Sequence, residues 1–278
     1  LKPELATAGV HHHPLLRPNT WWTYFNMEDP VVGGYTPEKI ALRRAIGMGY
    51  DVDEFIRVIL KGRAVPATSP IPPDIAGYDP ELKTQAQLYD PAAARALLDK
   101  LGYKDRDGDG YRETPDGKPL VIVRASTTDG AARAIDEQWK RDMDAIGVRT
   151  TFIKQRWPEL NRMGEAGQLM MWGVGNVAVI PDADTFYSLL YSGNIGSGNY
   201  AKLRLAEYDR LYEESRSISD ERARTILFHK MNDLIHAYAP WIINVHDYGI
   251  VITQPWLRGF KPDPLLRYQW KFYDVAPR

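Results

Sequence analysis

Residues 168–176 combine side chains that are suited to binding a small ligand. Residues 168–172 form a short apolar run, which predicts a buried strand that delivers Trp172 to the rim of a sheet. The next residues predict a loop whose backbone a ligand can approach, because glycine has no side chain in the way. Ligands of open α/β sheets bind in the crevice outside strand ends. The expected ligand contacts are Trp172, Gly173, Val174, Gly175 and Asn176, with Asn199 from a later polar turn. The alternative is a core tryptophan followed by an ordinary loop, with Asn199 capping its turn.

A second stretch, residues 105–116, has acids at loop positions 1, 3, 5, 9 and 12 and Gly110 at position 6. This spacing is close to an EF-hand calcium loop. Position 12 is Asp116 instead of glutamate, and a strand is expected to follow instead of a helix. A glycine-aspartate hairpin turn is therefore the favoured interpretation. Three adjacent histidines, His11 to His13, cannot all face one ion in a regular element, so we expect no metal site there.

Other motifs with known chemistry are absent or incomplete. The sequence has no Gly-x-Ser-x-Gly elbow, no phosphate loop and no His-Glu-x-x-His pair. Gly173-x-Gly175-x-x-Ala178 matches a dinucleotide fingerprint, but Pro181 follows where a helix would have to begin. Asp182 and Asp184 are expected to cap a helix, with paired acid-base carboxylates as the alternative. No cofactor is expected.

Composition narrows the class of protein. The 278 residues suffice for one large domain or two modest ones, and the net charge of -1 argues against a nucleic-acid binder. No apolar run approaches the roughly 18 residues of a membrane span. The chain has no cysteine, which excludes disulfides and suits an exported bacterial protein. It has no initiator methionine or signal peptide, so we expect a mature or trimmed product.

Hydrophobic periodicity and capping residues predict the elements that position these stretches. Helices are expected over 36–48, 51–61, 90–101, 129–146, 184–191, 205–215 and 220–238, with a short one from Trp157. Strands are expected over 21–26, 119–125, 148–153, 168–172, 241–253 and 267–275, whereas 1–20 and 66–78 should be irregular. The strand-helix-strand order between 119 and 153 predicts a partly parallel sheet.

Several short motifs together resemble the family 5 extracytoplasmic solute-binding proteins of ABC transporters, the oligopeptide, dipeptide and nickel-binding group. The motifs are Tyr24-Phe25-Asn26, Leu42-Arg43-Arg44-Ala45-Ile46 with Asp51, Gly62 with Pro66-Ala67, Ser69-Pro70-Ile71-Pro72, Tyr89-Asp90-Pro91 with Ala94 and Leu97-Leu98, Gly102-Tyr103, Asp105-x-Asp107-Gly108-Asp109-Gly110, Asn199, Tyr208-Asp209, Pro240 and Trp256-x-x-Gly259-Phe260. Their order and spacing resemble the C-terminal part of a family member over nearly the whole chain. In that family the acidic turn is widespread, which favours the hairpin over calcium.

The resemblance implies a type II periplasmic-binding fold, an α/β architecture that here comprises mainly the second lobe, with a mixed sheet and flanking helices. Residues 1–26 would belong to lobe I and the first crossing strand, 27–249 to lobe II, and 250–278 to the return to lobe I. Asn26 and His246 would be hinge residues. The chain would be a periplasmic, monomeric, non-enzymatic component that delivers a small-molecule or peptide ligand to the permease subunits of an ABC transporter. It would neither span the membrane nor bind nucleic acid.

In peptide-binding members, the loop after the tryptophan strand carries an aspartate that pairs with the peptide's amino terminus. Residues 173–176 contain no acid, so the reason to expect a free α-amino group in the ligand is lost. Two alternatives belong to other classes. One is a carbohydrate hydrolase that uses Asp182 and Asp184 beside aromatic platforms. The other is a protein-interaction domain with no small ligand.

Overall fold

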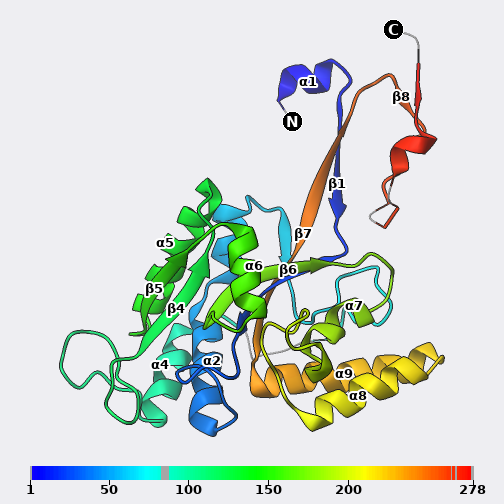
Figure 1. Cartoon of the computed structure of the whole chain (residues 1–278). Helices are drawn as coiled ribbons and strands as arrows, with labels where there is room; N and C mark the ends of the chain where they lie inside the picture. Colours follow the sequence, from blue (N-terminus) through cyan, green and yellow to red (C-terminus); the bar gives the residue numbers. More distant parts are fainter. Residues whose placement is uncertain (1, 83–87, 264, 267, 277–278) are drawn as a thin grey trace.

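A seven-stranded mixed sheet forms the centre of the protein (Figure 1), in a computed structural model that describes residues 2–82, 88–263, 265–266 and 268–276. The strand order is β1-β7-β2-β6-β4-β5, with β3 paired to β7 off this path. Strand β4 is parallel to β5 and β6, and the other pairs are antiparallel. The strands are β1 (His11–Leu16), β2 (Asn19–Phe25), β3 (Ala64–Pro66), β4 (Val121–Ser126), β5 (Arg149–Lys154), β6 (Met171–Val177) and β7 (Trp241–Thr253), and β8 (Leu257–Arg258) pairs separately with β9 (Asp274–Val275).

Helices cover both faces of the sheet. Aspartate side chains cap four of them, because Asp51, Asp90, Asp129 and Asp220 accept hydrogen bonds from backbone N–H groups of the first turn. The helices are α1 (Pro3–Thr7), α2 (Pro37–Gly49), α3 (Val52–Glu54), α4 (Pro91–Lys100), α5 (Gly130–Asp144), α6 (Trp157–Glu165), α7 (Asp184–Tyr187), α8 (Ala206–Ser217) and α9 (Glu221–Tyr238). The short helical turns are the π-helix η1 (Phe55–Ile59) and the 3-10 turns η2 (Ser188–Leu190), η3 (Ser192–Asn194) and η4 (Gln269–Phe272).

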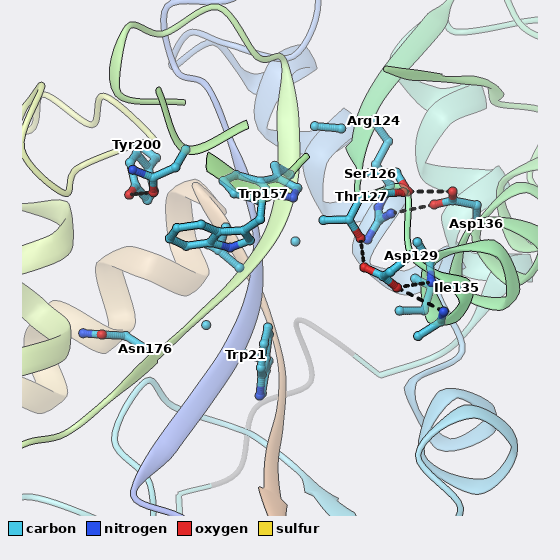
Figure 2. Close-up of a pocket in the computed structure, with 18 of the residues that line it drawn as sticks. Trp21, Arg124, Ser126, Thr127, Asp129, Ile135, Asp136, Trp157, Asn176 and Tyr200 are labelled. Carbon is cyan, nitrogen blue, oxygen red and sulfur yellow. Dashed lines mark hydrogen bonds and ion pairs between the residues drawn. The ribbon is translucent and has the colours of Figure 1, made fainter. Parts of the chain in front are cut away.

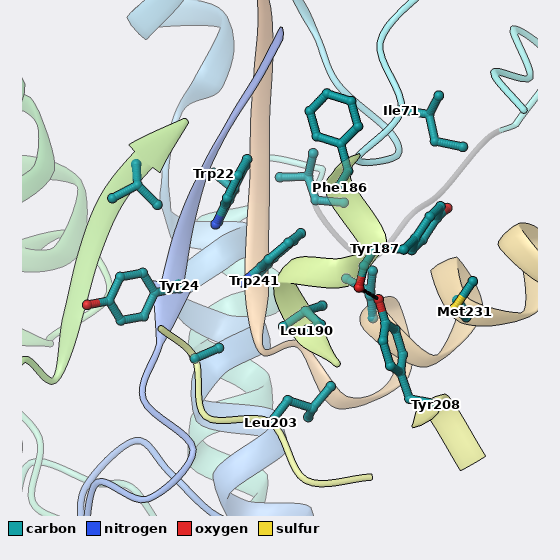
Figure 3. Close-up of a cluster of buried hydrophobic side chains, with 14 of the residues drawn as sticks. Trp22, Tyr24, Ile71, Phe186, Tyr187, Leu190, Leu203, Tyr208, Met231 and Trp241 are labelled. Atoms are coloured by element: carbon teal, nitrogen blue, oxygen red, sulfur yellow. Dashed lines mark hydrogen bonds between the residues drawn. The ribbon is translucent and has the colours of Figure 1, made fainter. Parts of the chain in front are cut away.

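Two hydrophobic cores lie on opposite faces of the sheet, because side chains of a strand alternate between faces. Helices α2, α4 and α5 pack on one face around the fully buried Trp139. Helices α6 to α9 pack on the other, where Trp22 stacks on Trp241 with 4.5 Å between ring centroids (Figure 3). There the Tyr208 hydroxyl donates to the carbonyl of Tyr187 at 2.8 Å, which joins α8 to α7.

A two-stranded ribbon leaves this body. Strands β1 and β2 follow each other along β7, so that β1 pairs with Tyr248 to Thr253 and β2 with the first part of β7. Only β1 and β7 continue beyond the body, and α1 and β8 lie near the far end of this ribbon (Figure 1). Residues 1–20 were expected to be irregular, but their described part, 2–20, contains α1, β1 and the start of β2. Strand β1 forms because β7 supplies it with a pairing partner.

The glycine-rich stretch is also more regular than expected. Strand β6 is Met171–Val177, so residues 173–176 are strand and not loop. The reason is tertiary: β2 pairs with β6 over its whole length, from Asn19↔Val177 to Phe25↔Met171. At the C-terminus, the strand expected over 267–275 is the η4 turn followed by the two-residue β9, with Arg267 outside the described residues.

Candidate ligand-binding cleft

A cleft of about 510 Å³ opens where two parallel strands separate. Strand β4 pairs with β6 only at Arg124↔Met171 and Ala125↔Trp172, and then ends, while β6 continues alongside β2. The cleft therefore lies at the carboxyl ends of β4 and β6, between them and α5 and α6, as is usual for α/β sheets (Figure 2). The predicted contacts Trp172, Gly173, Val174, Gly175 and Asn176 all line it.

The two glycines admit side chains of the protein itself. A Cβ atom on Gly173 would lie 2.9 Å from Nη2 of Arg124, and one on Gly175 would lie 2.7 Å from the ring of Trp21. Both distances are too short for a real side chain. The sequence interpretation, in which the glycines leave backbone open to a ligand, therefore needs revision: they make room for an arginine and an indole that lie on the strand.

Three tryptophans line the cleft with different exposure. The side chain of Trp172 is only 4% exposed and belongs to the core, with its ring 6.5 Å from those of Trp157 and Tyr200. By contrast, Trp21 is 44% and Trp157 is 60% exposed. Figure 2 shows these two rings beside β6. The platforms that a ligand can stack on are thus Trp21 and Trp157, and Trp172 supports Trp157 from the core.

Arg124 is the cation of the cleft. Its guanidinium is buried, lies 5.0 Å from the Trp139 ring and forms a 3.1 Å ion pair with Asp136. Asp136 also accepts from the Ser126 hydroxyl at 2.7 Å and from Lys154 at 2.8 Å, so two cations share one carboxylate. Burial lowers the pKa of Arg124, since a charged group loses hydration. Among the described residues, its Nη2 has no hydrogen-bond partner and can donate to a ligand.

Most other polar groups of the cleft are already used. Asp129 caps α5 and accepts from the Thr127 hydroxyl, a bond that lowers the pKa of this carboxyl group. Asn19 donates to Asp247, and the amide nitrogen of Asn176 donates to the carbonyl of Thr185 at 3.1 Å. Both carboxylates that line the cleft thus have protein partners. The arrangement suits a ligand held by ring contacts and by hydrogen-bond donors.

The remaining predicted contact, Asn199, does not line the cleft. Its side-chain nitrogen donates to the carbonyls of Tyr191 (3.0 Å) and Leu203 (3.3 Å), and its oxygen accepts from the Leu203 amide at 3.3 Å. This side chain is 1% exposed. The structure therefore favours the alternative in which Asn199 holds its turn.

The two predicted hinge residues occupy different places. Asn26 follows β2 at its end inside the body, where it donates to the Gly167 carbonyl at 3.0 Å. His246 lies near the base of the ribbon, with Nδ1 3.2 Å from the carbonyl of Asn19. The Thr20 hydroxyl, 3.1 Å from the same Nδ1, donates to the carbonyl of Pro70. Nδ1 must therefore carry the proton and donate to Asn19.

Burial of His246 should make stability depend on pH. Desolvation lowers its pKa to about 4, whereas in an unfolded chain histidine has a pKa of about 6.5. As pH falls, the histidine of the unfolded chain therefore binds a proton before that of the folded protein. The free energy of unfolding should be highest above pH 6.5 and should decline towards pH 4. The expected loss is about 3 kcal/mol.

Urea unfolding at several pH values measures this decline. His246→Asn keeps a donor near the Nδ1 position but cannot titrate. The free energy of unfolding of this variant should therefore decline less between pH 6.5 and pH 4 than that of the unmodified protein. Part will remain, because His236 is also buried with a lowered pKa. Equal pH profiles for both proteins would contradict the assignment.

Asp182 and Asp184 do not line the cleft. Asp182 forms a two-pronged ion pair with Arg224 at 2.8 and 3.0 Å, which lowers the pKa of this carboxyl group. It also accepts from the backbone amide of Asp184 at 2.8 Å, at the start of α7. Asp184 lies in the first turn of α7, but the N-cap residue is Ala183 and no side chain caps it, so the capping interpretation is only partly met. The contacts of Asp182 are structural, and they give the hydrolase alternative no support.

The acidic loop satisfies its own backbone. Asp105, Asp107 and Asp109 have carboxylate oxygens within 4.8 Å of one another. However, Asp105 accepts from the amides of Gly108 and Gly110, and Asp109 accepts from Tyr111 and pairs with Arg149. Asp116, the last position of the supposed calcium loop, bonds instead to Thr114 and Lys118.

We therefore expect calcium to leave the protein's stability unchanged. Thermal unfolding with and without an excess of CaCl2 measures this, because a ligand that binds only the folded state raises the midpoint. Magnesium is the control for ionic strength and divalent charge. A rise in midpoint specific to calcium would favour the metal-loop interpretation.

Sequence reasoning missed the exposed residues of the cleft. Trp21 and Trp157 were assigned only to a strand and a helix start, and Arg124 to a strand. One signal was available: a lone arginine inside the apolar run 120–125 indicates a buried charge that must have a partner. No local signal brings Trp21 to Gly175, because the two are joined by pairing between distant strands.

Comparisons with known proteins agree with this architecture. The sequence profile described as "Bacterial extracellular solute-binding proteins, family 5 Middle" matches residues 6–198. Among curated relatives, heme-binding protein A of Haemophilus influenzae is 28% identical over 82% of this chain and 40% of its own length. The dipeptide-binding protein of Escherichia coli is 23% identical over 86% of this chain and 43% of its own length.

Solved structures show the same fold over part of their length. The oligopeptide-binding protein AppA from Bacillus subtilis, in complex with a nonapeptide, superposes with a TM-score of 0.83 at 19% identity, over 96% of this chain and 53% of that one. The protein DppA from Helicobacter pylori, in complex with the peptide STSA, superposes with a TM-score of 0.80 at 20% identity. The match covers 99% of this chain and 51% of that one. The chain thus spans about half the length of these structures.

Proposed function

Because this chain belongs to the family 5 bacterial extracellular solute-binding proteins, we propose that it captures a small solute for an ABC importer and delivers it to the permease subunits. The observation that carries this proposal is the cleft at the fork of β4 and β6, with Trp21 and Trp157 exposed on its walls. The family consists of solute-binding proteins, so catalysis is not expected. We place the protein outside the cytoplasm, in the periplasm or its equivalent, as a monomer.

The chemistry of the cleft supports a ligand without a free amino group. An ammonium ion needs a carboxylate, and both carboxylates of the cleft already accept several bonds from the protein. Asp136 accepts from Arg124, Lys154 and Ser126, and Asp129 accepts from Thr127 and the first turn of α5. A charged donor that has no hydrogen-bond partner among the described residues is Nη2 of Arg124. The proposed ligand is therefore a planar or apolar solute with an oxygen acceptor. The named relatives bind heme, dipeptides and longer peptides, and this cleft is better suited to the first kind of shape.

The ribbon supports an arrangement in two lobes. We propose that residues 27–249 form lobe II, that residues 1–26 and 250–278 lead to lobe I, and that the crossing lies at the base of the ribbon near His246. Large apolar side chains are exposed on the ribbon and the tail, a pattern typical of an interaction surface. They are Ile250, Ile252, Tyr268, Trp270 and Phe272. Lobe I would cover them, and a ligand that contacts both lobes would favour the closed state by its differential affinity.

Native mass spectrometry of the protein purified from its own host tests the proposal. We expect a non-covalent adduct of small-molecule mass that disappears when the protein is unfolded. Its exact mass would distinguish a planar solute from a peptide. The protein-interaction alternative would be favoured if repeated preparations contained no adduct and if calorimetric titrations detected no binding of dipeptides or heme.

A further inference from the structure

A second pocket of about 210 Å³ adjoins the cleft. It shares Trp21, Arg124, Ile135 and Gly173 with the cleft, so the two spaces meet around these side chains. Apart from Trp22 on β2, its other walls come from elements that the cleft does not touch, namely the segment after α2, the π-helix η1 with Leu60 at its end, and strand β7. The pocket is thus a side chamber and not simply a continuation of the cleft along β6.

Trp21 stands between the two spaces. Its ring lies against Gly175, and its Nε1 donates to Asp247 at 3.1 Å. Asp247 lines the side pocket and also accepts from Asn19. The indole is therefore held at one edge while almost half of its surface remains exposed. A ligand that stacks on Trp21 in the cleft has the entrance of the side pocket next to it.

The far wall is built by an unusual turn. In η1 the amide of Leu60 bonds to the carbonyl of Phe55 at 3.0 Å, five residues apart, which is the π-helical pattern. Isolated π-turns are uncommon and occur frequently at functional sites. Here the two residues joined by this bond, Phe55 and Leu60, both line the pocket, together with the buried ring of Tyr50.

The pocket combines these apolar walls with two unsatisfied polar groups. Nε of Arg124 and Oδ1 of Asn244 are buried without a hydrogen-bond partner among the described residues, and both residues are more than nine-tenths buried. Unpaired buried polar atoms are rare because they are costly. An acceptor oxygen of a ligand would satisfy the arginine, and a donor would satisfy the asparagine. The Asp247 carboxylate of the same pocket already accepts from Asn19 and Trp21, which leaves Arg124 as the charged group with an open hydrogen-bonding position among the described lining residues.

We propose that this side pocket is a second subsite, which receives an aromatic ring of the ligand that carries an oxygen acceptor directed at Arg124. A dry cavity of about 150 Å³ holds benzene, so this volume suits one substituted six-membered ring. Calling it part of the solute site rests on the proposed function. The pocket itself can be tested with small probes, whatever the transported solute is.

Benzoate and benzylamine are matched probes, since they have the same ring and opposite charge. We expect saturable benzoate binding by calorimetry, and binding of benzylamine at least about tenfold weaker. Leu60→Trp should fill the pocket and weaken benzoate at least tenfold, because Leu60 lines the pocket but not the cleft. Ala131→Phe, which narrows only the cleft, is the control and should leave benzoate affinity within about twofold.

Crystals of the unmodified protein soaked with 4-bromobenzoate give a second test that does not depend on folding of a variant. The bromine anomalous signal should lie between Phe55, Leu60 and Tyr50. The subsite would be overturned by a bromine signal only in the cleft or by no signal at all. It would also be overturned if the unmodified protein and Leu60→Trp bound benzoate with equal affinity. None of these results would by itself remove the proposed transport function, which depends on the adduct from the host.

Discussion

Trp172→Ala should lower the free energy of unfolding by about 3–5 kcal/mol, the usual cost of removing a large buried side chain. The indole is 4% exposed and packs within the core that α6 to α9 form on the sheet. Its loss leaves a cavity behind Trp157 and Tyr200, whose rings both lie 6.5 Å away. Urea unfolding of the variant and the unmodified protein measures the effect. Binding should weaken as well, because the cleft loses its support.

Trp157→Ala is the matched control, because the same side chain is removed from the same cleft. Trp157 is the first residue of α6 and is 60% exposed, so its removal should change the free energy of unfolding by less than about 1 kcal/mol. It should nevertheless abolish retention of the solute in native mass spectrometry, because it removes a stacking platform. If Trp157→Ala were as destabilising as Trp172→Ala, or left solute retention unchanged, the distinction between support and platform would be wrong.

Arg124→Met should destabilise the fold by about 3–5 kcal/mol, since it leaves one member of a buried ion pair without its partner. Asp136 is buried on the sheet side of α5 and would keep only Ser126 and the half-exposed Lys154. The variant also loses the cation-π contact with Trp139, whose ring centroid is 5.0 Å from the guanidinium carbon. Methionine has a similar length, so the change removes charge more than volume.

Two further variants, each with a change on helix α5, complete this experiment. Arg133→Met breaks the exposed pair with Glu137, four residues further along α5, and should cost no more than about 0.5 kcal/mol. The double variant Arg124→Met with Asp136→Leu removes both buried charges and should recover much of the stability lost in the single variant. Strict additivity of Arg124→Met and Asp136→Leu, each measured alone, in the double variant would show that the pair is not coupled.

The comparison of predicted with observed helices and strands shows where local sequence information is enough to predict an element. The fold class and the family resemblance are confirmed, and helices α2, α4, α5, α8 and α9 lie close to their expected positions. These helices have a capping aspartate, proline at the first turn or a clear apolar period, all of which act within a few residues. The 13-residue strand β7 matches its expected bounds, because a long apolar run bounded by Pro240 has few other conformations.

The site was predicted in position but not in detail. Residues 172–176 do line the cleft, and their role as ligand contacts stays a prediction, as do the hinges Asn26 and His246. Glycines 173 and 175 were expected in a loop, because glycine disfavours strands when judged locally. Pairing with β2 supplies seven residue partners and overrides that preference. The same pairing places Trp21 on Gly175, 154 positions apart in the chain.

By itself, the amino-acid sequence determined helices α2, α4, α5, α8 and α9, strands β2, β4, β5 and β7, the absence of cysteine chemistry and the stretch where β6 delivers its tryptophan. Each of these depends on neighbours along the chain. Only the tertiary structure decided which tryptophans face the cleft, that Arg124 and Asp136 are partners, and that Asn199 holds a turn. These features depend on strand register and helix docking. A shift of one residue would turn every side chain of a strand to the opposite face, so the short-range pattern cannot specify them.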